Sequence, residues 1–146
     1  MSHSLRTYVP QVKARVSPNQ PFGVSLRLAA LSAEALVNAP QYGSLFESLV
    51  VANFIRCHSA QGEVPEHCYL DAKGITEIDL LCRSGQSWVA YEIKSGLTVT
   101  SASFRQLERA RSLLKADVKR YCLAAPVAKA YRQEGIEVVP WWNLQC

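Results

Sequence analysis

Three short apolar runs separated by turn segments constrain the fold more than any other feature of the chain. The runs span residues 67–71, 77–83 and 88–94, and the turns between them contain Ala72-Lys73-Gly74 and Ser84-Gly85-Gln86. Strands joined by such short turns pair with their neighbours in antiparallel fashion. The pattern therefore predicts a three-stranded meander. The third run, rich in β-branched and aromatic residues, is typical of a strand buried on both faces.

Helix and strand patterns on either side of the meander predict an α/β domain. Apolar residues recur at spacings of three and four in two segments, 43–58 and 103–115, which is typical of amphipathic helices. Further segments are predicted as a helix over 24–37, a strand over 118–124, a short helix over 126–134 and a last strand over 136–139. The order α-α-β-β-β-α-β-α-β predicts a mixed central sheet flanked by helices.

Length and composition favour a soluble globular protein. The chain has 146 residues, of which 49% are hydrophobic and 19% are charged, enough for one complete core. Residues 1–21 contain three prolines and show no periodicity, so we interpret them as an extended arm before a domain over 22–146. No apolar run approaches the roughly 20 residues of a membrane span. The odd number of cysteines, without a C-x-x-C pair, favours reduced thiols and a cytoplasmic location.

Charged side chains interrupt two of the apolar runs. In YEIKSG, residues 91–96, Glu92 and Lys94 share a face, because side chains alternate along a strand. Asp79 lies inside the preceding run, and pairing of strands about 4.8 Å apart can bring it close to Glu92. Glu47 is the one acid in the helix predicted over 43–58. Glu77, two residues before Asp79, is expected to be partly exposed at the start of its strand.

Carboxylates that converge in a core need a positive partner, because buried like charges repel one another at high cost. A bound divalent cation removes this cost, and oxygen ligands suit Mg²⁺ or Mn²⁺. We therefore predict a metal site formed by Asp79 and Glu92, with Glu47 as a third candidate ligand. Lys94 would stabilise negative charge on a phosphate or polarise a water beside the metal. The alternative is a structural ion pair between Glu92 and Lys94 at the end of the sheet.

Positive charge gathers in the second half of the chain. Residues 103–132 hold eight of the sixteen Lys and Arg residues and only two acids. A polyanion such as DNA could lie on this segment, with Arg105 and Arg109 as contacts. A solvated helix face is an equally simple alternative.

Two further groups of residues have competing interpretations. Cys57-His58 and His67-Cys68 offer zinc ligands, but adjacent Cys-His ligands are awkward geometrically, so we expect buried cysteines and surface histidines. Trp141 and Trp142 can stack on bases, but their place after the last strand predicts that they close the core.

The ordered segments YGSLFE, TEIDLL and YEIKSG resemble the core of the PD-(D/E)xK nuclease superfamily. More closely, roughly residues 41–140 are similar to the nuclease-like C-terminal domain of prokaryotic AAA-type ATPases. The resemblance implies a restriction-endonuclease-like αβββαβ core, metal ligation by Asp79 and Glu92, a catalytic role for Lys94 and an auxiliary metal or water contact for Glu47. Gln106 matches a glutamine of exonuclease-type members and is a further candidate contact to nucleic acid, although their tyrosine four residues later is Ala110 here.

These features predict metal-dependent hydrolysis of phosphodiester bonds in DNA, by a nuclease or a resolvase-like enzyme with Mg²⁺ or Mn²⁺ as cofactor. No G-x-x-x-x-G-K-[ST] occurs in the chain, which predicts no ATP site. An ATPase subunit acting in trans and a second copy of the chain are candidate partners besides DNA. The alternative from another class is a catalytically silent module of the same fold that binds DNA or a protein.

Overall fold

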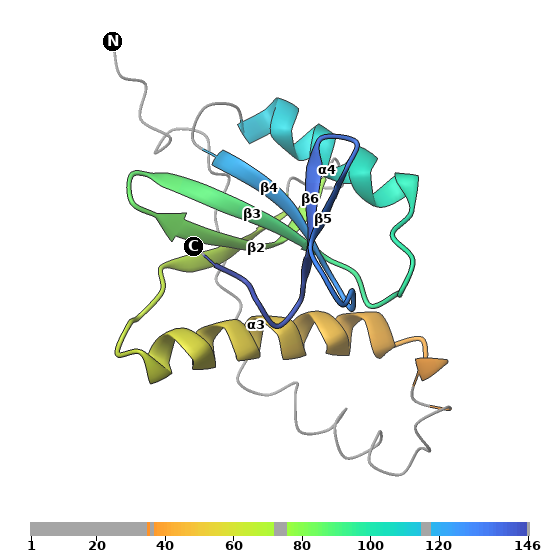
Figure 1. Cartoon of the computed structure of the whole chain (residues 1–146), viewed down its shortest axis with the longest axis horizontal. Coiled ribbons are helices and arrows are strands. Elements are labelled where there is room, and N and C mark those ends of the chain that lie inside the picture. The colour runs from red at the N-terminus through yellow and green to blue at the C-terminus, as the bar shows by residue number, and fades with distance from the viewer. Residues whose placement is uncertain (1–34, 36, 72–75, 115–117, 146) are drawn as a thin grey trace.

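The computed structural model describes residues 35, 37–71, 76–114 and 118–145. They form a six-stranded mixed sheet with one long helix on each face (Figure 1). The mixed α/β class predicted from the sequence is confirmed. The predicted arm over 1–21 lies outside the described residues, as does most of the helix predicted over 24–37, of which Ala35 and Val37 are described and helical.

The predicted meander is present as three antiparallel strands, β1 His67–Asp71, β2 Glu77–Ser84 and β3 Ser87–Ile93. The turn between β2 and β3 has Gly85 at φ 61°, a conformation that glycine adopts without steric cost. The pairing of Ser84 with Ser87 across this turn sets the register of the whole hairpin. The turn predicted over 72–74 lies outside the described residues.

A helical crossover extends the sheet beyond β3. Helix α4, Ser101–Leu114, leads to β4, Val118–Ala125, which pairs in parallel with β3. Strand β6, Ile136–Pro140, then pairs in parallel with β4. The strand order is β1-β2-β3-β4-β6-β5, so the antiparallel meander and the parallel strands share one sheet.

The short helix predicted over residues 126–134 is wrong. Residues 131–133 instead form strand β5, Tyr131–Gln133, which pairs in antiparallel fashion with β6. Glu134 and Gly135 both have positive φ, 52° and 78°, and two consecutive residues of this kind make a tight hairpin turn. All three residues of β5 are exposed, so the strand carries no apolar alternation that would reveal it.

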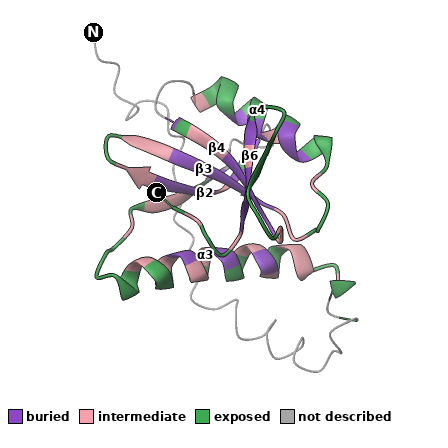
Figure 2. Ribbon diagram, in the orientation of Figure 1, coloured by how far each residue is buried: buried purple, intermediate pink, exposed green. Residues whose placement is uncertain are grey.

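The core has two layers, one on each face of the sheet (Figure 2). Helix α3, Tyr42–Ala60, buries Phe46, Val50 and Phe54 against one face, at the spacing of four that lines up one side of a helix. Helix α4 covers the other face with Phe104, Leu107 and Ala110. Residues 89–93 of β3 are all buried, as predicted for a strand covered on both faces.

The buried stripes of the two helices are narrower than the sequence suggests. Leu49, counted in the stripe of α3, is 53% exposed, and Leu113, counted in that of α4, is 47% exposed.

In the described part of the chain, no helix is both long enough and apolar enough to cross a membrane.

Candidate functional site

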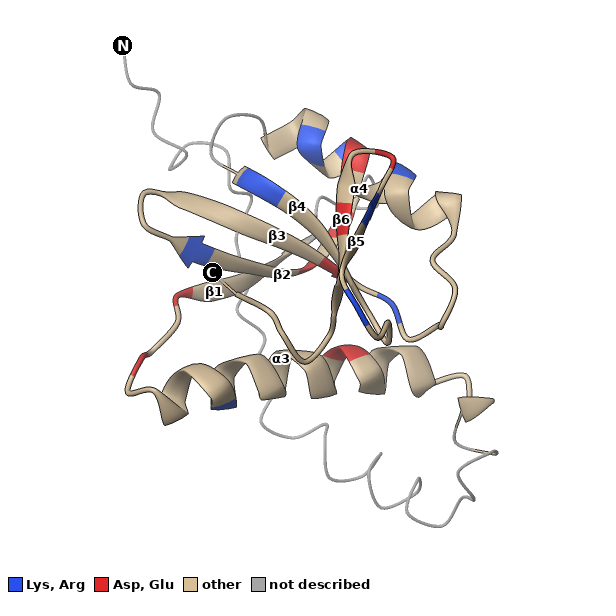
Figure 3. Ribbon diagram, viewed as in Figure 1, with Lys and Arg blue, Asp and Glu red and all other residues tan. Residues whose placement is uncertain are grey.

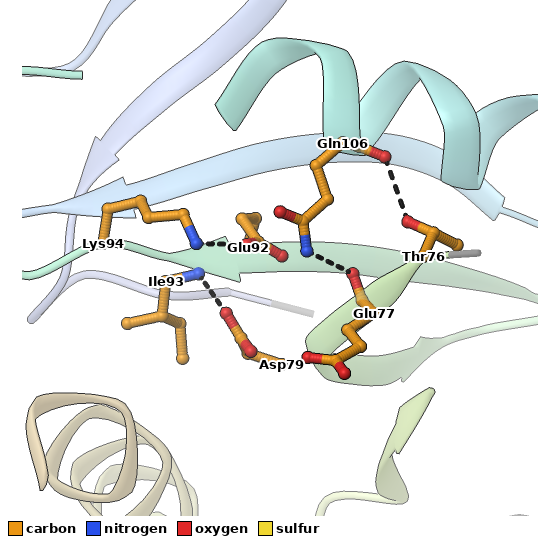
Figure 4. A network of polar contacts seen from close by, with 7 residues as sticks. All are labelled: Thr76, Glu77, Asp79, Glu92, Ile93, Lys94 and Gln106. Carbon is orange, nitrogen blue, oxygen red and sulfur yellow. Dashed lines mark hydrogen bonds and ion pairs between the residues drawn. The ribbon is translucent and has the colours of Figure 1, made fainter. Parts of the chain in front are cut away.

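The acidic residues lie where strands β2 and β3 stop pairing. The antiparallel ladder ends at the pair Leu80–Tyr91, while β3 continues to pair with β4 as far as Ile93. The next residues in register are Asp79 on β2 and Glu92 on β3. The peptide N–H of Ile93 donates a hydrogen bond of 2.7 Å to Oδ2 in the side chain of Asp79 on β2 (Figure 4). The Asp79 side chain thus takes the place of a strand carbonyl.

A register shift on the other side of β2 accompanies this opening. The β1–β2 pairing shifts between Cys68 and Leu70, so that Tyr69 alone faces both Asp79 and Leu80. One extra residue in a strand breaks the alternation of its side chains, and such bulges commonly aim a side chain at a functional site. This bulge was not predicted from the sequence, in which Asp79 interrupts the apolar run without fixing how the two strands pair.

Glu92 is buried with only one of its carboxylate oxygens satisfied. Its side chain is 1% exposed, and Nζ of Lys94 donates a hydrogen bond to its Oε1 (Figure 4). The other oxygen, Oε2, is buried and has no hydrogen-bond partner among the residues that the structure describes. Because an unpartnered buried carboxylate oxygen is costly, the site lacks one positive or hydrogen-bonding neighbour. Lys94 is 34% exposed, so its ammonium group reaches from this carboxylate to the surface.

The local electrostatics show that the carboxyl groups repel one another. Burial, and then the charge of Asp79, raise the pKa of Glu92 to about 7, although the hydrogen bond from Lys94 opposes the rise. Burial also raises the pKa of Asp79, although the hydrogen bond from the Ile93 N–H opposes this rise. Burial disfavours the Lys94 ammonium, but its hydrogen bond to Glu92 and the nearby carboxylates outweigh this, so that its pKa is raised. Lys94 therefore stays protonated.

Glu47 joins the same group from helix α3. It is half-buried, and burial followed by the charge of Asp79 raises its pKa to about 7, while Lys94 opposes this rise. The structure thus brings together all four residues singled out in the sequence, Glu47, Asp79, Glu92 and Lys94. Three acids share one lysine, which leaves an excess of negative charge when all are ionised.

Two residues at the start of β2 tie the site to helix α4. Nε2 of Gln106 donates to the backbone oxygen of Glu77 at 3.2 Å, and the buried hydroxyl of Thr76 donates to the backbone oxygen of Gln106 at 3.2 Å (Figure 4). Gln106 therefore positions β2 against α4. Glu77 is exposed, as predicted, and its charge contributes to the raised pKa of Asp79. Sequence reasoning missed Thr76, whose role depends on a contact with a distant helix.

The donor set fits a magnesium-type ion better than a cation enclosed by protein ligands. Among the described residues, no group of three or more His, Cys, Asp and Glu side chains is placed to hold a metal ion. Mg²⁺ is usually held by one or two carboxylates, with waters and substrate phosphates as its other ligands. Asp79 and Glu92 meet that requirement, and the unpartnered Oε2 of Glu92 is an oxygen available to such an ion.

The histidines of the two Cys-His pairs contact oxygen atoms of the protein. The burial of the cysteines and the exposure of the histidines differ from the prediction. His58 and His67 are half-buried, and their Nδ1 atoms lie 2.8 Å from Oε2 of Glu63 and 2.9 Å from the oxygen of Pro65. Cys57 is exposed. The prediction of buried cysteines and surface histidines is therefore wrong for these residues, because both imidazoles pack against the aromatic ring of Phe54.

The other candidate residues lie around the periphery. Arg105 and Arg109 are exposed on α4, and Arg105 contacts Oγ of Ser101 at 3.4 Å. Trp141 packs edge-on against Phe46 with ring centroids 5.8 Å apart, which closes the core as predicted. Trp142 is 50% exposed, so that prediction is wrong for the second tryptophan.

Comparison with known proteins gives a family for the chain. A search of curated proteins finds no match. A family model described as Domain of unknown function (DUF4143) matches residues 42–144, which run from the start of α3 to beyond β6 and include the whole acidic site. The chain belongs to this family of domains of unknown function, DUF4143.

Proposed function

We propose that the chain is a PD-(D/E)xK-like nuclease that hydrolyses phosphodiester bonds in DNA with Mg²⁺ or Mn²⁺ at Asp79 and Glu92. One observation carries the proposal. Glu92 is buried at the point where two strands separate, with Lys94 on one oxygen and, in the described part of the chain, no partner on the other. A residue placed in this way costs stability in the folded protein, and a bound cation would offset that cost.

Each residue of the site has a role that its position supports. Asp79 and Glu92 would hold the cation, with Glu47 as an auxiliary contact from the opposite helix. The bound ion would supply positive charge to a phosphodiester oxygen. Lys94, protonated and partly exposed, would stabilise the negative charge that develops on the phosphate.

DNA as substrate is supported by the cations on α4. Arg105 and Arg109 project from the same helix whose Gln106 contacts the start of β2, next to the acids. Exposed guanidinium groups beside an acidic site would contact the phosphates that flank the scissile bond. Contacts between these guanidinium groups and the phosphates would also offset the repulsion between the phosphates and the acidic residues.

A second function is favoured by a different observation. Lys94 already neutralises Glu92, and within the described ranges the acids do not form a three-ligand cluster. The same fold would then act as a catalytically silent module that binds DNA or a protein partner. An ATPase subunit in trans and a second copy of this chain are the candidate protein partners.

Cleavage of labelled single-stranded and branched DNA distinguishes the two functions. We expect cleavage with Mg²⁺ or Mn²⁺, none with EDTA, and none by Lys94→Met that remains folded by circular dichroism. Lys129→Met, which removes an exposed lysine after β4, is the matched control and should cleave normally. A wild-type protein that cuts none of these substrates in either metal would favour the silent module.

A further inference from the structure

A polar contact joins helix α4 to the start of β2, three residues before Asp79. Charged residues lie along α4 (Figure 3), whereas the residues that this helix buries are uncharged, namely Ser103, Phe104, Leu107 and Ala110. Gln106 lies between these buried positions and is itself half-buried. Through Gln106, α4 makes hydrogen bonds with the start of β2.

The hydrogen bonds between the two segments run in opposite directions. The hydroxyl of Thr76, a residue that is 5% exposed, donates to the backbone oxygen of Gln106 at 3.2 Å. Nε2 of Gln106 in turn donates to the backbone oxygen of Glu77, the residue after Thr76, at 3.2 Å (Figure 4). Each segment therefore supplies one donor and one acceptor. Two opposed bonds fix both the distance and the rotation between α4 and β2, which a single bond would not do.

The helix backbone does not need the bond from Thr76. In the middle of an α-helix each carbonyl accepts the N–H of the residue four positions later, which for Gln106 is Ala110. Loss of the hydroxyl would therefore leave the carbonyl of Gln106 with its helical partner. What the bond supplies is an anchor for the start of β2, where the described chain resumes after the gap at residues 72–75.

The anchor lies on the same side of the sheet as Glu92. Thr76 contacts α4 directly, and Ile78, two residues later, belongs to the core layer under α4. Tyr91 and Ile93 belong to the layer under α3, so that Glu92 between them points towards α4. Figure 4 shows that the side chain above these strands extends from α4 towards them.

Strand pairing constrains the segment around Asp79 less than it constrains the rest of β2. The pairing of β2 with β3 ends at Leu80–Tyr91, one residue before Asp79. On its other side β2 pairs with β1, which is the edge strand of the sheet, across the register shift opposite Tyr69. A displacement at the start of β2 would therefore move Asp79 relative to Glu92, and the anchor on α4 opposes it.

We propose that Thr76 is a positioning residue of the metal site, because its bond to α4 fixes the separation of the Asp79 and Glu92 carboxylates and thereby the affinity for Mg²⁺ or Mn²⁺. The inference rests on the proposed function, since it requires a cation at these two residues. Mg²⁺ demands near-ideal geometry, so a small displacement of one ligand weakens its binding. Residues that orient metal ligands from outside the coordination sphere typically contribute about 10–100-fold to metal affinity.

Calorimetric titration of Mn²⁺ into the full chain tests this role. Thr76→Val replaces the hydroxyl by a methyl group and should weaken Mn²⁺ binding by about tenfold or more. Thr76→Ser keeps the hydroxyl and should bind like the wild type. Ser112→Ala is the matched control, because it removes a hydroxyl that donates to the backbone oxygen of Glu108 at 3.0 Å within α4, and it should also bind like the wild type. If Thr76→Val does not fold, Thr76→Ala takes its place.

Amide hydrogen exchange in EDTA gives a second readout that needs no metal. The N–H of Ile93 is held by Oδ2 of Asp79 at 2.7 Å, so a displaced Asp79 should expose this amide to exchange. In Thr76→Val, exchange at Ile93 should become faster by about fivefold relative to Val89 in the middle of β3, the effect expected for one lost hydrogen bond. Thr76→Ser and Ser112→Ala should leave this ratio unchanged. A general loss of stability would raise both rates by the same factor.

The positioning role and the metal site can fail separately. Equal Mn²⁺ affinity in the wild type and Thr76→Val, or an unchanged ratio of the exchange rates at Ile93 and Val89, would overturn the role of Thr76 while the metal site stands. Absence of Mn²⁺ binding by the wild type would overturn the proposed function, and the positioning of a metal with it, whatever the exchange rates.

Discussion

Replacing Glu92 by glutamine should change how the stability of the metal-free protein depends on pH. Glu92 is buried and its Oε2 has no partner within the described ranges, so the folded state disfavours its charged form. Its folded pKa, about 7, lies above the ordinary value of 4.5. The folded protein therefore binds a proton more tightly than the unfolded chain does. The stabilising contribution of this proton is complete below pH 4.5 and is lost as pH rises towards and through 7.

The size of this loss follows from the two pKa values. Between 4.5 and about 7, at about 1.4 kcal/mol for each pH unit, the free energy of unfolding falls by about 3 kcal/mol. Glu92→Gln keeps the shape of the side chain and cannot ionise. The variant should therefore lose about 3 kcal/mol less than the wild type between pH 4.5 and pH 8. The decrease in the free energy of unfolding that comes from ionisation of Glu47 should remain in the variant.

Urea unfolding in EDTA, followed by circular dichroism at several pH values, measures this difference. Glu66→Gln, which changes an exposed acid in the loop before β1, is the matched control and should follow the wild type. Wild type and Glu92→Gln with parallel profiles between pH 4.5 and pH 8 would refute the reasoning, because Glu92 would then ionise as readily in the folded as in the unfolded state.

Three further predictions concern other parts of the molecule. Lys94→Met should lower the free energy of unfolding by about 2–4 kcal/mol in EDTA, because the buried carboxylate of Glu92 loses its partner, and by clearly less in saturating Mn²⁺. Equal losses in urea melts with EDTA and with Mn²⁺ would indicate a purely structural ion pair. Gly135→Ala should destabilise the protein by about 1 kcal/mol in thermal melts, since the φ of Gly135 is 78°, whereas Gly43→Ala in α3 should be neutral or stabilising. Equal stability of the two variants would contradict the hairpin turn. The double variant Arg105→Ala with Arg109→Ala should reduce the slope of log DNA affinity against log salt by the amount expected for up to about two lost phosphate contacts. An unchanged slope would indicate that these residues form a solvated helix face.

Local patterns were sufficient to predict most of the sheet and the approach of two acids. Apolar runs between short turns marked β1, β2 and β3 to within about one residue. The two-residue turn at Gly85 also sets the register that places Asp79 beside Glu92. Strand β5 could not be found in this way, because it has three exposed residues and pairs only through its backbone.

The parts of the site that depend on packing between distant segments could not be predicted. The sequence marks Glu47 as an isolated acid on an apolar helix, but its coupling to Asp79 depends on how α3 crosses the sheet. The register shift opposite Tyr69 depends on how β1 and β2 pair, which the hydrophobic pattern of either strand does not fix. The contact between Thr76 and Gln106 joins β2 to α4 across 30 positions of the chain.

Calorimetric titration of Mn²⁺ at pH 8 tests the central claim most directly, because every later step depends on a cation held by Asp79 and Glu92. The account predicts that the wild type binds Mn²⁺, that Asp79→Asn binds it at least tenfold more weakly, and that Glu66→Gln binds it like the wild type. Each carboxylate ligand lost should cost at least about 1.4 kcal/mol of binding free energy, which corresponds to this tenfold change. Equal affinity in the wild type and Asp79→Asn, or no Mn²⁺ binding by the wild type, would contradict the account.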